Sequence, residues 1–222
     1  MVVHRLNFLG SPNIGIYALA TDHYAIIPPQ ITNRKVFMLR RNLKSEIIQS
    51  NLGGTRLIGV LAAANSHGMV VPHFVSDSEI TSIQTVHPTK IVKIESKITA
   101  FGNLILANDH GGIVSRMLFR ERGVIKQISE ALDIEVVPGE IAGLPYVGSV
   151  AVATNKGVLA HPMLRPVERS LLREMLKVHV DVGTINGGSP FLGSGILANN
   201  VGVIIGNLTT GPEIMMVSNV LE

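Results

Sequence analysis

The chain has 222 residues, of which 46% are hydrophobic, and its 19 Lys and Arg against 16 Asp and Glu give a formal net charge of +3. So small an excess does not predict general nucleic-acid binding, and the absence of cysteine excludes disulfides, zinc–thiolate sites and thiol catalysis. No apolar stretch reaches the length of a membrane span and the N-terminus lacks a signal-peptide pattern, so we expect a soluble cytoplasmic protein.

A five-fold repeat with a period of about 44 residues covers almost the whole chain. Each copy has a glycine, an alanine five positions later, and then Asn or Thr. A second glycine follows three positions further on, except in the first copy, which has Tyr24. The first glycines are Gly15, Gly59, Gly102, Gly148 and Gly193, and the alanines are Ala20, Ala64, Ala107, Ala153 and Ala198. We expect one domain, 1–222, with repeats 7–51, 52–97, 98–141, 142–185 and 186–222.

The first predicted element, residues 2–8, is a strand that closes the ring. The fifth copy ends in a predicted helix and lacks a last strand of its own, so the N-terminal segment can supply it and remove an exposed sheet edge. The first copy also has a basic stretch, 34–44, in the place of the helix predicted for the other copies.

The second copy shows the repeating unit most clearly. Residues 57–64 form a short apolar run, which predicts a strand buried on both faces, and Gly68 then occupies a turn where a positive φ is easily adopted. After a second strand, Ser76 and Glu79 predict a capping box and a helix to about Val86. Charged and apolar residues alternate over 90–95, which predicts a half-exposed strand and makes the unit β-β-α-β.

The later copies repeat this order. Pro166 stands at a first helical position, where its missing N–H has no cost. The predicted helices are 121–132, 168–176 and 212–220, and the predicted strands include 104–107, 112–114, 134–137 and 177–182.

Candidate chemistry along the chain is sparse. Three histidines share one turn position, at which the fourth copy has Lys156 and the fifth Val201; they are His23, His67 and His110. Neighbouring turn tips are expected to lie too far apart to share an ion, so these residues predict a solvated rim rather than a metal site. The glycine-rich segment 186–193 lacks the lysine and helix start of a phosphate loop. Gly193-Ser194-Gly195 falls in a predicted first strand rather than a nucleophile elbow, so we expect no catalytic residue, metal or cofactor.

The repeat resembles the translation initiation factor 6 family, in its archaeal type, nearly from end to end. Segments 100–103, 148–157 and 209–213 and the pair His161-Pro162 add to the resemblance. It implies the pentein fold, a five-bladed α/β propeller with pseudo-five-fold symmetry, in which β-β-α-β repeats surround a central water-filled channel. The repeat itself gives the same number of blades.

The resemblance also implies a function without catalysis. Such a factor binds the large (50S) ribosomal subunit and sterically prevents its association with the small (30S) subunit, with a further role in large-subunit maturation. The implied partners are an L14-type ribosomal protein and the rRNA near the sarcin–ricin loop. A monomer is expected, with neither a membrane nor DNA as partner.

The resemblance implies a ribosome-facing end near the start of each blade's first strand. The matching positions are Arg56, Val60 and Asn103, and Asn13 and Tyr146 are added because they precede equivalent glycines. Asn103 is preferred, because it ends a stretch that keeps the family's Ala-Leu-Gly-Asn pattern with Phe for Leu. Val60 stands where eukaryotic members have arginine, so no charge acts there. The alternative for Asn103 is a strand-end polar group bonded to the backbone.

Two other functions are alternatives. Guanidino-modifying enzymes of the pentein superfamily use a cysteine nucleophile in the channel, and this chain has no cysteine. A general RNA-binding module would bind unrelated RNAs with a steep dependence on salt.

Overall fold

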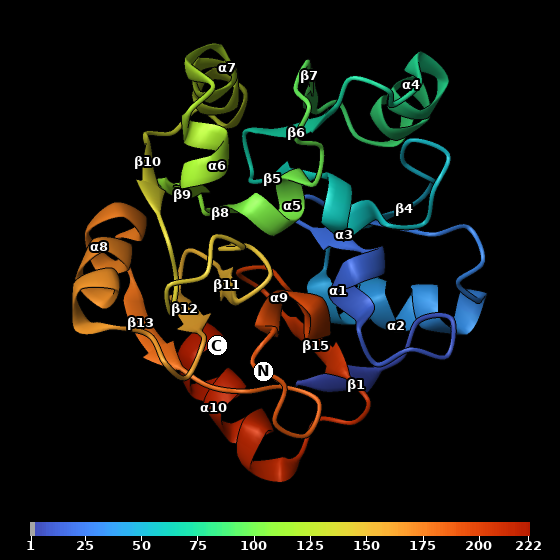
Figure 1. Cartoon of the computed structure of the whole chain (residues 1–222). Helices are drawn as coiled ribbons and strands as arrows, with labels where there is room; N and C mark the ends of the chain where they lie inside the picture. Colours follow the sequence, from blue (N-terminus) through green and yellow to red (C-terminus); the bar gives the residue numbers. More distant parts are fainter. Residues whose placement is uncertain (1–2) are drawn as a thin grey trace.

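The computed structural model describes residues 3–222, which form five three-stranded sheets arranged in a ring with the longer helices outside (Figure 1). In each sheet the middle strand pairs antiparallel with the inner strand and parallel with the outer one. The sheets, each with its inner strand first, are β2 (Leu19–Ala20), β3 (Tyr24–Ile27) and β4 (Glu46–Gln49); β5 (Ala63–Ala64), β6 (Gly68–Pro72) and β7 (Lys90–Ile94); β8 (Ile105–Ala107), β9 (Gly112–Ser115) and β10 (Val136–Gly139); β11 (Ala151–Ala153), β12 (Gly157–Ala160) and β13 (His179–Val182); and β14 (Ile196–Ala198), β15 (Val203–Gly206) and β1 (His4–Leu6). We number the five units in this order. The predicted mixed α/β class is confirmed.

The N-terminal strand closes the fifth sheet as predicted. β1 pairs in parallel with β15, with His4 opposite Ile204 and Leu6 opposite Gly206. The predicted strand began at Val2, which lies outside the described residues.

The outer helices are α2 (Asn33–Leu43), α4 (Asp77–Val86), α7 (Arg122–Leu132), α8 (Pro166–Leu176) and α10 (Gly211–Leu221), with the single turn α6 (Arg116–Phe119) ahead of α7. The basic stretch of the first copy is therefore helical. Pro166 is the first residue of α8, and the capping box of Ser76 and Glu79 begins α4, as predicted.

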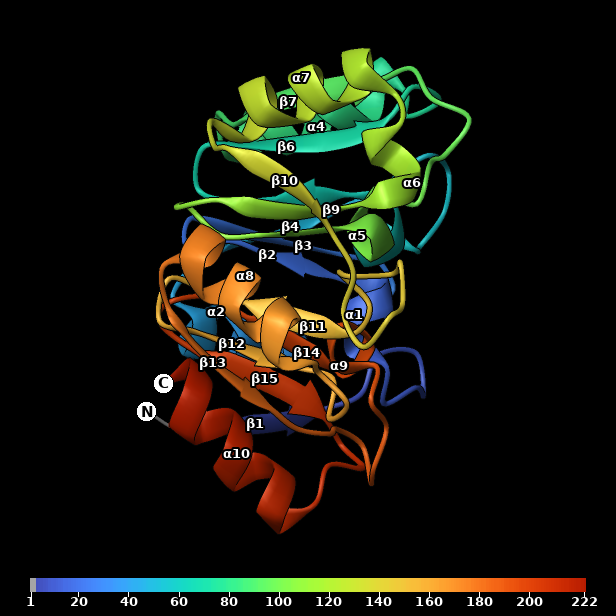
Figure 2. The same ribbon diagram turned by 60° about the vertical axis from the view of Figure 1, so that its left-hand side comes forward.

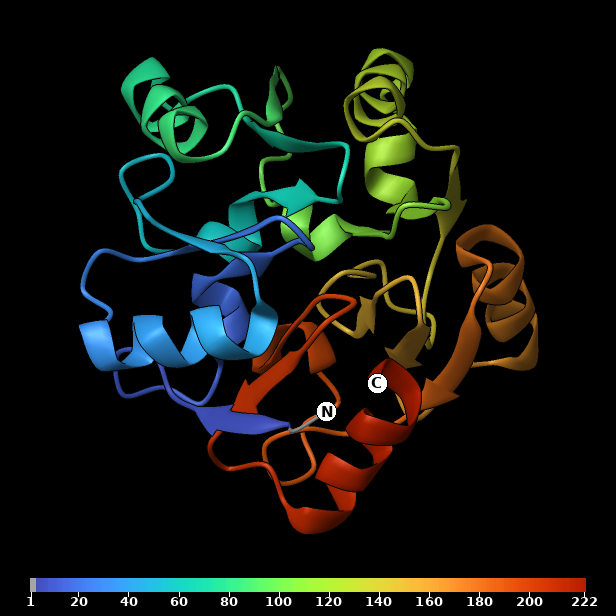
Figure 3. The same ribbon diagram turned by 180° about the vertical axis from the view of Figure 1, so that it is seen from behind.

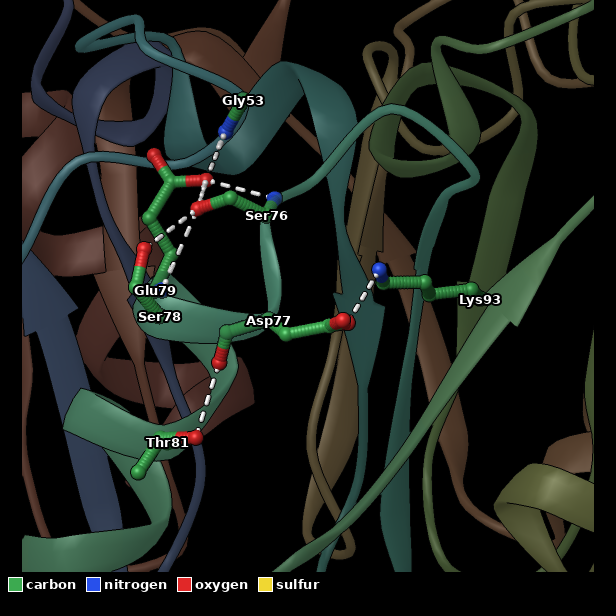
Figure 4. A network of polar contacts seen from close by, with 7 residues as sticks. All are labelled: Gly53, Ser76, Asp77, Ser78, Glu79, Thr81 and Lys93. Atoms are coloured by element: carbon green, nitrogen blue, oxygen red, sulfur yellow. Dashed lines mark hydrogen bonds and ion pairs between the residues drawn. The ribbon is translucent and has the colours of Figure 1, made fainter.

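The capping glutamates also hold the loops of their units in place. Glu79 accepts hydrogen bonds from the N–H groups of Gly53 and Ser76, within the network drawn in Figure 4, and also from the N–H of Gly54. Glu213 of α10 likewise accepts from Gly187 and Gly188. Burial alone would raise the pKa of Glu213, but the hydrogen bonds from Thr210, Gly188 and Gly187 outweigh it and hold the pKa at about 2.

The predicted strand over 57–64 is wrong in its first half. Residues 58–61 form a single helical turn, α3, and of the predicted strand only Ala63 and Ala64 pair in a sheet. Equivalent turns are α1 (Ile14–Tyr17), α5 (Phe101–Leu104) and α9 (Leu192–Gly195), so the stretch around Ser194 is also helical rather than a strand. A short apolar run cannot show this, because the turn is set by contacts between units.

Those contacts explain the first glycine of each repeat. A Cβ on Gly59 would collide with the carbonyl oxygen of Gly15 and lie 2.5 Å from that of Ala18. Each of the five glycines packs on the one before it in the same way, and Gly15 packs on Gly193, which completes a ring of backbone contacts. No side chain fits at these positions.

The second glycine is explained differently from the prediction. Gly68 does not have a positive φ; instead a Cβ there would collide with the carbonyl oxygen of Ala131, near the end of α7 in the next unit. Gly111, Gly157 and Gly202 meet a neighbouring helix end in the same way. Both glycines of the repeat therefore serve close packing between neighbouring units.

The hydrophobic core is also divided between units. The described residues form five buried clusters, and each joins residues of two neighbouring units. One contains Tyr24 and Ile48 of the first unit with Leu52 and Ile83 of the second, and another contains Leu6 and Ile204 of the fifth with Leu39 of the first. A single unit cannot bury its own apolar face, so the five units depend on each other for stability.

Candidate functional site at the mouth of the central cavity

The inner strands and the short helices surround a set of axial cavities lined by all five units. The largest of these three, about 390 Å³, opens where the short helices lie, on the side that carries α1, α5 and α9 in Figure 2. We call it the mouth. Besides the five ring glycines it is lined by Asn13, Ile16, Val60, Asn103, Ser149, Ser189, Phe191 and Ser194.

The structure brings together three of the five residues assigned from sequence. Asn13, Val60 and Asn103 line the mouth. Arg56 is exposed and lines an adjoining cleft of about 490 Å³ near Leu57. Tyr146 is 47% exposed and lines neither cavity.

Six further residues of this end were not assigned from sequence. Ile16, Ser149 and Ser194 follow their ring glycines directly, as Val60 and Asn103 do, and Leu57 and Phe191 precede theirs by two positions, as Asn13 and Tyr146 do. Aligning all five copies would have identified these five. Ser189 lies in a loop outside both positions of the repeat, and the alignment gives no signal for it.

The side chains at the mouth are largely free to bind something else. The amide group of Asn103 forms no hydrogen bond with residues 3–222, so the backbone-bonded alternative is not what the structure has. Its backbone does help to join units, because its carbonyl accepts from the N–H of Gly148. Asn13 makes only a long contact of 3.4 Å with Asn186, and the hydroxyl of Ser194 donates to the carbonyl of Phe191.

At the opposite end, which Figure 3 turns toward the reader, the turn side chains form hydrogen bonds to backbone carbonyls and to one another. Asn65, Asn108 and Asn199 each donate two hydrogen bonds to carbonyls of the next unit; for Asn108 these are the carbonyls of Thr154 and Leu176. The first and fourth copies have Thr21 and Thr154 at this position. A threonine has no side-chain amide, and each hydroxyl donates to a carbonyl of its own turn rather than to the next unit.

A second line of hydrogen bonds crosses this end. It runs through Asp22, Asn200, Asn155, Asp109 and Ser66. Burial alone would raise the pKa of Asp109, but the hydrogen bonds from Asn155 and Ser66 outweigh it and lower the pKa. The cavity here is only about 40 Å³.

The mouth can offer hydrogen bonds and apolar contact, but its lining side chains carry no ionisable group for proton transfer near neutral pH. Within residues 3–222 no group of three or more His, Cys, Asp or Glu could hold a metal ion. In the same part of the chain, no helix is long and apolar enough to cross a membrane.

The five repeated α/β units form a ring with an uncharged, open mouth, which places the chain among repeat proteins of mixed α/β class. The model of the eIF-6 family matches residues 3–220, so the chain belongs to the eIF-6 family. It is 41% identical to "Translation initiation factor 6" of Pyrococcus abyssi over 226 residues, which cover 100% of this chain and 99% of that protein. The protein of the same name from Methanocaldococcus jannaschii is 37% identical, with 99% and 98% covered.

Proposed function

We propose that this protein is a translation initiation factor that binds the large (50S) ribosomal subunit and prevents the small (30S) subunit from joining it. Full-length relatives named translation initiation factor 6 support the role in initiation. We further propose the pentein fold for residues 1–222, a cytoplasmic location, and a part in large-subunit maturation.

The observation that supports docking through the mouth is the difference in how polar side chains are used at the two ends. At the turn end they bond to backbone carbonyls and to each other, whereas the amide of Asn103 is unpaired within the described residues. Arg56 and the exposed Leu57, Tyr146 and Phe191 surround the same end. Aromatic residues and arginine are enriched where protein interfaces gain most of their binding energy.

The proposed mechanism is steric. The mouth faces an L14-type ribosomal protein beside the sarcin–ricin loop, and the body of the ring then occupies space that the small subunit needs. Affinity and position determine such an effect, so no reacting group is required at the mouth.

Cosedimentation with separated ribosomal subunits tests the proposal. We expect the protein to pellet with large subunits, not with small ones, and to reduce the yield of whole ribosomes when both are mixed. Binding to neither subunit, or equally to both, would contradict it.

A variant pair tests the docking surface. Asn103→Ser should weaken large-subunit binding by about tenfold, because one buried hydrogen-bonding group at an interface is worth about 1.4 kcal/mol. Asn219→Ser is the matched control, since Asn219 is exposed on α10 away from the mouth. Equal binding by both variants would remove Asn103 from the interface.

A further inference from the structure

The excess positive charge of the chain is concentrated in one helix. Residues 33–44, which are α2 and its C-cap, hold five of the 19 Lys and Arg and none of the 16 Asp and Glu. The remainder of the chain therefore has 14 basic and 16 acidic residues, and its charge is slightly negative. The weak overall charge conceals a basic surface on the first unit.

Four of these five cations are available. Arg34, Arg40, Arg41 and Lys44 are exposed, and none forms a salt bridge within residues 3–222. The fifth, Lys35, donates instead to the carbonyl and the side-chain oxygen of Asn7.

The four cations share one face of α2 with an aromatic ring. Arg34, Phe37 and Arg41 are spaced at i, i+3 and i+7, and Phe37 is 65% exposed. At 1.5 Å per residue the face extends about 15 Å from Arg34 to Lys44, which suits several consecutive phosphates.

A cleft of about 510 Å³ adjoins the C-terminal end of this face. It is lined by Asp22, His23, Arg40, Lys44, Ser45, Glu46 and His87. Ser45 is only 5% exposed, and its hydroxyl has no hydrogen-bond partner in the described part of the chain. A buried hydroxyl without a partner is costly, so a ligand oxygen here would satisfy it.

The acidic groups of this cleft are already engaged. Asp22 accepts two hydrogen bonds from Asn200, and Glu46 lies 3.6 Å from Nδ1 of His87. His87 also packs on the rings of His23 and Tyr24, with centroids 5.6 and 5.2 Å apart. Tyr24 stands where the other units have their second glycine, so this seam differs from the rest of the ring.

We propose that the α2 face, made of Arg34, Phe37, Arg40, Arg41 and Lys44, binds the phosphate backbone of single-stranded RNA. The guanidinium groups of the three arginines and the ammonium group of Lys44 contact phosphates, and the ring of Phe37 stacks on a base. A membrane is a poorer fit, because Leu39 and Leu43 on the inner side of α2 are fully buried and leave no broad apolar face. The choice of RNA among polyanions rests on the proposed ribosomal function, whereas the basic surface itself does not.

The test measures binding of a fluorescein-labelled single-stranded RNA of mixed sequence, about 20 nucleotides long, as salt is raised. Four phosphate contacts predict a slope of log affinity against log salt of about −3. The variant with Arg34, Arg40, Arg41 and Lys44 all changed to Gln should lose most of this slope and at least about tenfold in affinity at low salt. Phe37→Ser should weaken binding severalfold with the slope unchanged.

The control changes Lys97, Arg120, Arg173 and Lys177 to Gln, which removes the same charge from other exposed positions. It is closely matched, because Arg173 and Lys177 end α8 as Arg40 and Lys44 end α2, with the lysine in a left-handed C-cap in both. The control should bind RNA like the parent chain. Equal losses in both quadruple variants, no RNA binding by the parent, or binding to phosphatidylserine vesicles in place of RNA would overturn the proposal.

Pelleting the same variants with large subunits separates the two proposals. A parent chain that binds RNA through α2 yet fails to pellet would contradict the ribosomal function and leave the basic surface standing. A chain that pellets normally but does not bind free RNA would overturn only the α2 face.

Discussion

The two ends of the central cavity are built from the same five repeats, yet they are closed by different parts of the chain. At the mouth, backbone packs against backbone through the ring of glycines, and the side chains beside them stay open around about 390 Å³. At the turn end, Asn, Asp and Ser side chains form hydrogen bonds across four of the five seams between units, and only about 40 Å³ remains. Closure by backbone therefore leaves side chains available for binding.

The largest expected effect comes from blocking the backbone closure. In Gly59→Ala the new Cβ would collide with the carbonyl oxygens of Gly15 and Ala18, so we expect the free energy of unfolding to fall by about 3 kcal/mol or more. Urea denaturation measures it. Gly123→Ala is the control, because nothing lies within 4 Å of that helical glycine, and it should stabilise slightly. A Gly59 variant as stable as the parent would contradict closure by glycine.

The next effect tests the side-chain closure. Asn108→Ala removes two hydrogen bonds to the next unit at a residue that is 4% exposed, and should cost about 2.5 kcal/mol. Thr154→Ala, at the same repeat position but without bonds across the seam, should cost about 1 kcal/mol. Equal losses would mean that the cross-seam bonds contribute nothing.

A smaller effect concerns the loop that brings Ser189 and Phe191 to the mouth. Glu213 anchors this loop, and its pKa falls from 4.5 to about 2 on folding. Because the folded pKa is the lower one, the stabilisation is complete above about pH 4.5 and disappears as the pH falls toward 2. After allowance for solvent screening we expect about 1.5 kcal/mol. Glu213→Gln should be less stable than the parent by this amount at pH 7 and equal to it near pH 2; a constant difference would exclude the titration.

The smallest effect on stability is expected at the mouth. Asn103→Ser removes no hydrogen bond made within residues 3–222, so its free energy of unfolding should change by less than about 0.5 kcal/mol. Thermal unfolding at neutral pH would show this. A loss comparable to that of Asn108→Ala would show that Asn103 has a structural role and weaken its assignment to docking.

Much of the architecture follows from the repeat, because a period of about 44 residues fixes the number of units and the capping signals fix the helix starts. The sequence does not predict the single-turn helices, because a segment such as 58–61 is short and apolar, like a buried strand. It becomes helical because Gly59 packs closely on Gly15 of the neighbouring unit. Gly68 was assigned to a positive φ for the same reason: its neighbour Ala131 is distant in sequence. Contacts between units are invisible to patterns within one unit.

The candidate site divides in the same way. The resemblance to the family implied Asn103 and Val60, and Asn13 was added by its distance from a repeat glycine; the structure brings all three into one cavity. The basic stretch 34–44 is evident in the sequence, but the sequence does not show that four of its five cations form no salt bridge within residues 3–222. Nor does it show that the turn-end asparagines donate to carbonyls of the next unit, because such contacts join different repeats.

The pairing of β1 with β15 has a consequence for the order in which the protein is made. His4 precedes its partner Ile204 by 200 residues along the chain. β1 is therefore synthesised well before the strand with which it pairs. Closure of the ring has to wait for β15, so it joins two segments that are made far apart in time.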